Sequence, residues 1–186
     1  MAKRIFDIIF SLTAIVSLSW LLVLVYLAAS AATRSGGLFV QKRIGRFGKA
    51  FTIYKFRTIN PENGMINRVS GFLRFSKLDE LPQFFNVLFG DMSIVGPRPD
   101  VAGYYDTLKG EDRQLLNLRP GITGPASLKY FDEEGILSRQ VDSLKYNDEV
   151  IFPDKVRINR IYQERQSVVL DIKIILYSVI GKKLWE

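Results

Sequence analysis

The chain has 186 residues and a net charge of +7, and it contains neither cysteine nor histidine. This length suits one compact domain together with a membrane element. Without cysteine there is no disulfide framework or thiolate metal site, and without histidine the most common general base is missing. Any chemistry must therefore use carboxylates, lysines, tyrosines or hydroxyls, and any metal should be a hard ion such as Mg²⁺ bound through oxygen.

The basic residues are concentrated in the first third of the chain. Residues 1–60 carry nine Lys or Arg against a single acidic residue, Asp7, whereas the remainder is close to neutral. A basic segment beside an apolar run indicates an anionic membrane surface or a phosphate-bearing substrate. RNA binding is the rival interpretation, but the aromatic residues here follow a strand-like pattern and match no nucleic-acid-binding motif. We therefore expect anionic lipids, and no nucleic acid, as partners.

Ile8 to Ala32 is a run of 25 residues without a charge. It is longer than the roughly 20 residues that cross a hydrocarbon core as a helix. A cleaved signal peptide is the alternative, but its apolar core is shorter, at about 7–15 residues. We expect residues 1–34 to form a membrane-embedded helix and residues 35–186 to form a cytoplasmic catalytic domain.

Basic residues flank this run on both sides, with Lys3 and Arg4 before it and Arg34, Lys42 and Arg43 after it. Positive charge favours the cytoplasmic side, so a straight crossing would satisfy only one end. A re-entrant helix that bends and returns to the same face satisfies both. The run contains no proline, but serine and threonine side chains between residues 11 and 19 can hydrogen-bond to backbone carbonyls and ease a bend.

The remaining pattern predicts a mixed α/β fold that is mostly helical, with a short β element and amphipathic helices. The expected elements, in chain order, are extended segments at Leu38–Val40 and Phe51–Tyr54 around a turn at 45–48, helix over Gly71–Phe89 interrupted near Pro82, ordered loops from Gly96 to Pro125, and helix from about Pro153 to Trp185.

Two apolar stretches lie beside charge in a way that also suits a membrane interface. One is Phe84, Phe85, Leu88 and Phe89. The other is a stripe in the last helix, comprising Val168, Val169, Ile172, Ile175, Leu176 and Val179 and followed by Lys182-Lys183-Leu184-Trp185. Ordinary core packing is the favoured interpretation of both, and the phenylalanine-rich stretch is the better interface candidate.

The densest group of reactive residues runs from Arg74 to Gln83 and contains Asp79 and Glu80 shortly before Pro82. Two acids followed by proline predict the first turn of a helix, where Asp79 could act simply as a cap. In the functional interpretation, ionised Asp79 attacks phosphorus to form an acyl phosphate, and Glu80 holds Mg²⁺.

Basic side chains suited to phosphate binding lie in three further motifs. Lys55 and Arg57 alternate with aromatic residues on a predicted strand, Arg98 lies between two prolines, and Arg119 precedes Pro120. These arginines could instead pair with acidic residues across loops, namely Asp91, Asp100 or Asp112. Taken together, the motifs indicate a surface that binds a diphosphate.

Four motifs occur in order: Phe51–Thr58 (FTIYKFRT), Leu78–Asn86 (LDELPQFFN), Gly90–Pro99 (GDMSIVGPRP) and Arg119–Gly124 (RPGITG). With them, the chain from Lys3–Asp7 to Leu170–Lys173 resembles the small monotopic phosphoglycosyl transferases, a family of bacterial sugar transferases.

The resemblance implies a re-entrant helix and a domain on the cytoplasmic face of the bacterial inner membrane. It implies that Asp79 attacks a UDP-sugar, that UMP leaves, and that a polyprenyl phosphate such as undecaprenyl phosphate collects the phosphosugar, which begins capsule, O-antigen or glycoprotein glycan assembly. Asp79 would be the nucleophile and Glu80 the Mg²⁺ ligand. Lys55, Arg74, Arg98 and Arg119 would surround the phosphates.

Two positions depart from the family pattern. Members often bend the membrane helix at a Ser-Pro pair, where this chain has Ser19-Trp20, and many carry an acid at the position of Asn159. A catalytically silent membrane scaffold of the same fold is the alternative function. The motifs specify neither the sugar nor an oligomeric state.

Overall fold

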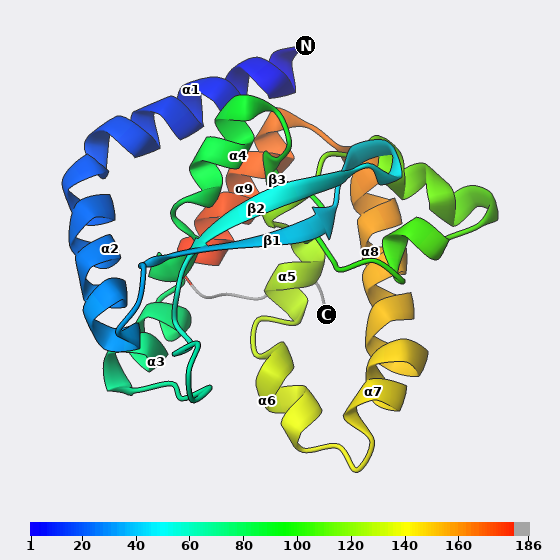
Figure 1. Ribbon diagram of the computed structural model, residues 1–186. Helices are drawn as coiled ribbons and strands as arrows, with labels where there is room; N and C mark the ends of the chain where they lie inside the picture. The colour runs from blue at the N-terminus through cyan, green and yellow to red at the C-terminus, as the bar shows by residue number, and fades with distance from the viewer. Residues whose placement is uncertain (181–186) are drawn as a thin grey trace. The chain divides into compact units, whose positions relative to one another are not determined.

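The computed structural model describes residues 1–180, which are mostly helical with two small two-stranded sheets (Figure 1). The predicted fold class is therefore confirmed. The chain forms two compact units, Met1–Arg43 with Ala50–Ile94, and Ile44–Lys49 with the chain from Val95 onward. The predicted boundary at residue 34 depends on membrane embedding rather than on internal contacts, so it stays a prediction.

The first unit contains both helices and strands. They are α1 (Ala2–Ser17), α2 (Ser19–Thr33), β1 (Leu38–Ile44, whose last residue belongs to the second unit), β2 (Ala50–Phe56), α3 (Arg68–Phe75), the 3₁₀ turn η2 (Leu78–Glu80), α4 (Gln83–Phe89) and the start of β3 (Ser93–Val95). The predicted β segments are confirmed and are each seven residues long. The helix expected over Gly71–Phe89 instead begins at Arg68, ends at Phe75 and resumes at Gln83.

Helices α1 and α2 meet at a bend of 68°. Leu18 breaks the helix with φ −101° and ψ 12°, and Ser17 Oγ donates to the Thr13 carbonyl at 2.7 Å. Such side-chain bonds to the preceding turn bend helices. The predicted bend thus forms without proline. Within residues 1–180, neither helix alone has the length and hydropathy of a membrane crossing, whereas the bent pair has both.

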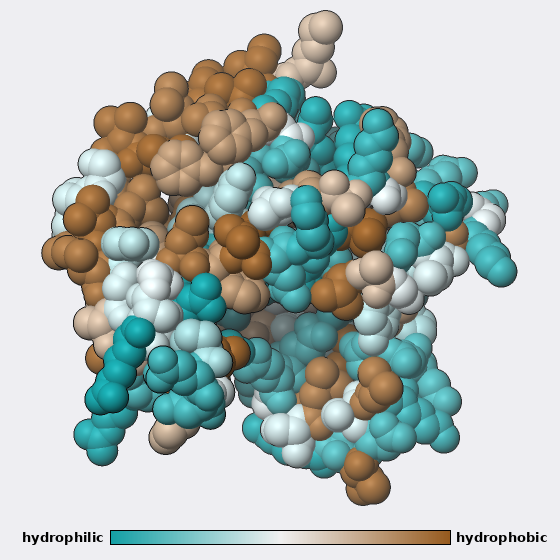
Figure 2. All heavy atoms as spheres, viewed as in Figure 1, coloured by the Kyte–Doolittle hydropathy of each residue, from teal (hydrophilic) through white to brown (hydrophobic). Residues whose placement is uncertain are grey.

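Much of the surface of this helix pair is apolar. Figure 2 shows hydrophobic side chains gathered over α1 and α2. The exposed ones include Ile5, Ile9, Val16, Trp20, Val23, Leu24 and Leu27. An apolar patch of this kind on a folded chain marks contact with a membrane or a partner.

The opposite side of α2 packs into the first unit. Val25 and Ala29 form a buried cluster with Phe56 of β2 and Leu73 of α3. The Tyr26 and Phe56 rings also meet edge to face, with centroids 6.5 Å apart. Helix α4 lies against α1, where Phe84 contacts Phe10 (Figure 1). These contacts fix the bent pair against β2 and α4.

The second unit is built mainly of short helices. Its elements are η1 (Arg46–Gly48), the 3₁₀ turns η3 (Tyr105–Thr107) and η4 (Gly110–Asn117), β4 (Gly121–Thr123), α5 (Pro125–Lys129), α6 (Glu133–Ser138), α7 (Ser143–Tyr146), the π-helical η5 (Asn147–Ile151), α8 (Phe152–Arg165) and α9 (Val168–Ile180). Its buried cluster contains Tyr105, Leu115, Leu116 and Val156. The loops expected between Gly96 and Pro125 thus include a strand and two 3₁₀ segments.

The last predicted helix is two helices, because α8 ends at Arg165 and α9 begins at Val168. The expected continuation to Trp185, including Lys182 and Lys183, lies outside the described residues.

Core packing, the favoured interpretation of the stripe in α9, is wrong for most of its residues. Helix α9 buries the face that carries Asp171 and Ile174, and Ser178 on this face binds Thr123 at 2.6 Å. The stripe lies on the other face, so Val169, Ile172, Leu176 and Val179 are exposed. The phenylalanine-rich stretch is partly packed, since Phe89 is exposed but Phe84 contacts α1.

Candidate active site

The acidic pair lies in a turn between two short helices. Lys77 follows α3 with φ +57°, which reverses the chain, and the Glu80 amide donates to the Lys77 carbonyl at 3.1 Å. Asp79 and Glu80 therefore belong to the 3₁₀ turn η2, and α4 starts only after Pro82. The prediction that they form the first turn of an α-helix is wrong, because Lys77 and Pro82 isolate the turn on both sides.

Asp79 is buried, with 8% of its surface exposed. Its Oδ1 atom is shielded from solvent and has no hydrogen-bond partner within the described chain. Buried polar atoms almost always have a partner, and leaving one unpaired is costly. An unpaired carboxylate oxygen is therefore available to a ligand or reacting group.

The pKa of Asp79 is raised from 3.8 to about 6, mainly by burial and also by the neighbouring Glu80 carboxylate. The positive charges of Lys55, Lys77 and Arg74 act in the opposite direction and limit the shift. A carboxylate in this setting is ionised at neutral pH but poorly solvated, which makes it a better nucleophile or base than a surface aspartate.

Glu80 is equally buried, at 7% exposed. Lys55 of β2 donates to Glu80 Oε1 at 3.0 Å. This ion pair joins the predicted strand motif to the acidic turn, two segments 25 residues apart in sequence. Three predicted site residues, Lys55, Asp79 and Glu80, are thus brought together. Arg74, in the last turn of α3, contributes its charge to the same location.

Arg57 serves a different purpose from Lys55. Its guanidinium donates to the carbonyls of Gly36 and Leu38 at 3.0 and 3.2 Å, which ties the end of β2 to the start of β1. As predicted, Tyr54 and Phe56 lie on the opposite face of β2 from Lys55. Phe56 is buried.

Arg98 and Arg119 belong to the second unit, whereas the acidic pair belongs to the first. Their loops are joined by backbone bonds, Gly96 N to Thr123 O at 3.0 Å and Gly121 N to Pro97 O at 2.8 Å. A Cβ atom on Gly96 would collide with the Arg119 carbonyl. Glycine thus allows the two arginine-bearing loops to pass backbone to backbone. Of the acids considered as alternative partners, Asp112 is bound by Arg160 at 3.1 Å.

Three polar residues that support the site were not assigned a role from the sequence. Asn86 bonds to the Thr52 carbonyl at 2.7 Å and the Tyr54 amide at 3.0 Å, which fixes α4 against β2. Arg4 donates to the Val87 and Leu88 carbonyls at the end of α4. For Asn86 the signal was available, because it is a polar residue between Phe85 and Val87 at the end of the motif LDELPQFFN.

The third is Asp7, which is 2% exposed and lies in α1. It accepts bonds from Ser93 Oγ at 2.9 and 3.0 Å and from the Ile94 amide at 3.1 Å. These hydrogen bonds offset the cost of burying the Asp7 carboxylate. Arg4 and Asp7 therefore pin α1 to α4 and β3.

The residues present could bind Mg²⁺ only if a substrate supplied some of its ligands. Within residues 1–180, no group of three acidic side chains could enclose a metal. Mg²⁺ is commonly held by one or two carboxylates together with substrate phosphates and water. Two adjacent carboxylates, one with an unpaired oxygen, meet that requirement.

Comparison with known proteins places these features in a family. The family model for bacterial sugar transferases matches residues 1–182. A UDP-glucose:undecaprenyl-phosphate glucose-1-phosphate transferase of Klebsiella pneumoniae is 32% identical over 95% of this chain and 39% of its own length. The exopolysaccharide production protein PSS of Rhizobium leguminosarum bv. phaseoli is 31% identical over 97% of this chain and 94% of its own.

An undecaprenyl-phosphate galactose phosphotransferase of Salmonella typhimurium is 34% identical over 66% of this chain and 31% of its own length. The chain spans about 39% of the glucose-1-phosphate transferases that it matches. The match to the family model covers all of the described residues, including the acidic turn and the arginine loops. The chain therefore belongs to the bacterial sugar transferase family.

Proposed function

We propose that this protein transfers a sugar 1-phosphate from a UDP-sugar to a polyprenyl phosphate and releases UMP. The names of its relatives supply the reaction class. The observation that carries the proposal is the buried Asp79 carboxylate, whose unpaired oxygen lies among the charges of Lys55, Lys77 and Arg74.

In the first step, a carboxylate oxygen of Asp79 attacks the phosphorus that bears the sugar. An Asp79–phosphorus bond forms and the bond from this phosphorus to the oxygen of the UMP phosphate breaks, so that UMP leaves with that oxygen. Burial removes the water that would otherwise solvate the carboxylate, and the three cations keep it ionised near neutral pH.

In the second step, a phosphate oxygen of the polyprenyl phosphate attacks the same phosphorus. The bond to Asp79 breaks and its carboxylate is restored, giving a polyprenyl diphosphate sugar. No net redox change occurs, and each phosphorus keeps four oxygens. A covalent intermediate replaces one difficult transfer by two displacements at the same carboxylate.

The basic residues neutralise phosphate charge during both displacements. Lys55 is already held at the carboxylate pair by Glu80, and Arg74 contributes its charge there. Arg98 and Arg119 are the expected ligands of the donor diphosphate, because arginine binds phosphate through two parallel bonds. Glu80 would hold Mg²⁺, which neutralises developing charge on phosphate oxygens when it is bound.

We also propose that the bent pair α1–α2 is embedded in the cytoplasmic leaflet of the bacterial inner membrane and returns to the side it entered. The apolar surface of the pair and the basic residues at both ends support this topology. Basic residues at the boundary would bind anionic lipids.

The reaction is tested with purified protein in lipid nanodiscs, undecaprenyl phosphate, Mg²⁺ and a panel of UDP-sugars. We expect UMP release from at least one donor and a lipid-linked diphosphate sugar as product. Release of a different nucleotide, or full complementation in cells by an Asp79→Ala, Glu80→Ala double variant, would contradict the proposal.

A further inference from the structure

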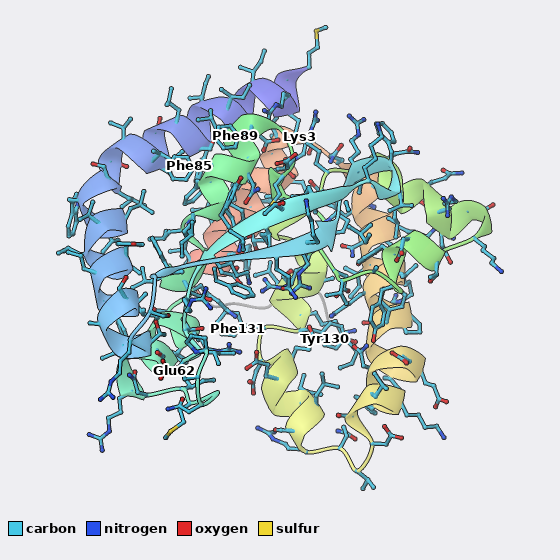
Figure 3. The ribbon with its side chains drawn as sticks, viewed as in Figure 1. Lys3, Glu62, Phe85, Phe89, Tyr130 and Phe131 are labelled. Carbon is cyan, nitrogen blue, oxygen red and sulfur yellow. The ribbon has the colours of Figure 1, made fainter. Side chains whose placement is uncertain are left out.

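The first unit contains an apolar groove that the proposed chemistry does not explain. It has a volume of about 530 Å³ and lies along the inner side of the α1–α2 bend. Its lining includes Ile15, Leu22 and Val23 of the bent pair, Tyr54 of β2, and Phe85 and Phe89 of α4. Figure 3 shows Phe85 and Phe89 projecting from α4 on the side of α1. This volume is typical of ligand pockets.

The groove is open to the surroundings rather than filled by the protein's own core. Val23 and Phe89, which both line it, are 59% and 67% exposed. Aliphatic and aromatic surface of this kind gains free energy when hydrocarbon covers it. A groove lined in this way suits an apolar ligand.

The groove lies next to the reacting carboxylates. Pro82 forms part of its lining and is two residues from Glu80. Tyr54 and Phe56 line it from one face of β2, while Lys55 between them reaches Glu80 at 3.0 Å. One strand thus presents an apolar face to the groove and an ammonium group to the acidic pair. An occupant with a hydrocarbon chain and an anionic end matches both.

We infer that this groove binds the first isoprene units of the polyprenyl phosphate acceptor. The inference rests on the proposed function, since it assigns a binding surface to the proposed second substrate. A lipid whose phosphate must reach Asp79 has to place the adjoining hydrocarbon in nearby apolar space, and the lining that includes Pro82 provides it. The chain is then held while its phosphate is oriented for attack.

The test uses wild-type protein in nanodiscs and a farnesyl phosphate that carries a diazirine on its first isoprene unit. After illumination, we expect adducts on residues 15–26 or 82–89, on side chains that line the groove. Excess undecaprenyl phosphate should reduce labelling at least tenfold, and the same excess of phosphatidylglycerol should not. Labelling spread evenly over the outer face of α2, or equal competition by phosphatidylglycerol, would overturn the inference.

A matched pair of variants gives a second readout. Val23 and Leu24 are neighbours and similarly exposed, at 59% and 54%, but only Val23 lines the groove. In Val23→Trp the larger ring fills part of the groove, so the KM for undecaprenyl phosphate should rise at least tenfold, whereas Leu24→Trp should behave as wild type. Equal KM values for the two variants would overturn the inference.

The two proposals fail in different ways. Groove labelling that undecaprenyl phosphate suppresses, in a protein that releases no UMP from any donor, would support the groove and contradict the transfer reaction. UMP release and lipid product without labelling of the groove would do the reverse. Single-turnover UMP release without acceptor reports the donor step alone, so a defect of Val23→Trp can be assigned to the acceptor step.

Discussion

Asp79 in the first unit and Asp154 in the second show how differently one residue type can be used. Burial and the neighbouring Glu80 carboxylate raise the pKa of Asp79 to about 6, and the positive charges of Lys55, Lys77 and Arg74 oppose this shift without cancelling it. Burial also raises the pKa of Asp154, but hydrogen bonds from Lys129, Arg157 and Tyr130 outweigh it and lower the pKa to about 2.

The difference lies in what each carboxylate binds. Asp154 accepts bonds from Lys129 at 2.9 Å, Tyr130 at 2.8 Å and Arg157 at 2.7 Å, so both of its oxygens are occupied. Asp79 leaves Oδ1 without a hydrogen-bond partner among residues 1–180. A carboxylate whose oxygens all accept hydrogen bonds stabilises the fold. A buried carboxylate with an unpaired oxygen is available for chemistry.

The largest effect should come from exchanging each aspartate for its isosteric amide. Asp79→Asn removes the nucleophile, and sugar-phosphate transfer should fall on the order of 10⁴-fold or more. Asp154→Asn, the matched control, should retain transfer. UMP release measures both. Similar losses in the two variants would mean that the distinction between the two carboxylates is mistaken.

The next largest effect should come from removing the positive charge of Lys55, which lowers the pKa of Asp79. Lys55→Met leaves Glu80 without its ammonium partner and weakens phosphate binding, so kcat/KM for the UDP-sugar should fall on the order of 10²–10³-fold. Lys42→Met removes an exposed lysine from the neighbouring strand β1 and serves as the control. A comparable loss in both would indicate a general effect of net charge.

The pH dependence of kcat/KM should follow the titration of Asp79. The reacting form is the carboxylate, so activity should rise with pH to a plateau above about 6 and fall about tenfold per pH unit below it. Because Lys55 lowers this pKa, Lys55→Met should move the acidic limb to higher pH. A limb that stays in place in this variant would contradict the assignment to Asp79.

The smallest effects are on the free energy of unfolding, which Asp79→Asn should raise and Asp154→Asn should lower at neutral pH. The folded-state pKa of Asp79 is raised, so its ionisation costs stability above pH 6, and Asp79→Asn should be more stable at pH 7.5 by at most about 3 kcal/mol. That gain should vanish below about pH 4. Thermal unfolding in nanodiscs at both pH values measures it.

Asp154 has a lowered pKa, so its contribution is present above about pH 4 and is lost as pH falls toward 2. Asp154→Asn should therefore lose about 1–2 kcal/mol at neutral pH. A shift of the unfolding temperature in the same direction for Asp79→Asn and Asp154→Asn at pH 7.5 would contradict the opposite effects of the two carboxylates on stability.

The sequence predicted the features that follow from local pattern. A bend within the apolar run followed from basic residues on both flanks and from serine side chains, although its position at Leu18 did not. The strands followed from the apolar pattern around the 45–48 turn. The family followed from four ordered motifs. The resemblance placed Lys55 around the substrate phosphates, but its ion pair with Glu80 was not predicted. Asn86 fixes α4 against β2 beside this pair.

Other features depend on tertiary contacts that no local pattern encodes. The positive φ of Lys77 moves the acidic pair out of a helix, although lysine seldom adopts that conformation. The apolar stripe of α9 satisfied the periodicity of a buried face, but the helix buries Asp171 instead, because Tyr162 donates to that carboxylate at 2.6 Å. Arg4 was interpreted as flanking charge and Asp7 was given no role, and in the structure they bind α4 and β3.

The central claim is that Asp79 itself carries the phosphosugar between the two substrates. Wild-type protein and Asp79→Asn are incubated with Mg²⁺ and the UDP-sugar that releases UMP, without acceptor, then quenched rapidly and analysed by peptide mass spectrometry. We expect a sugar-phosphate adduct on Asp79 in the wild type, its absence in Asp79→Asn, and its disappearance when undecaprenyl phosphate is added. An adduct on another side chain, or turnover that proceeds with no adduct, would contradict it.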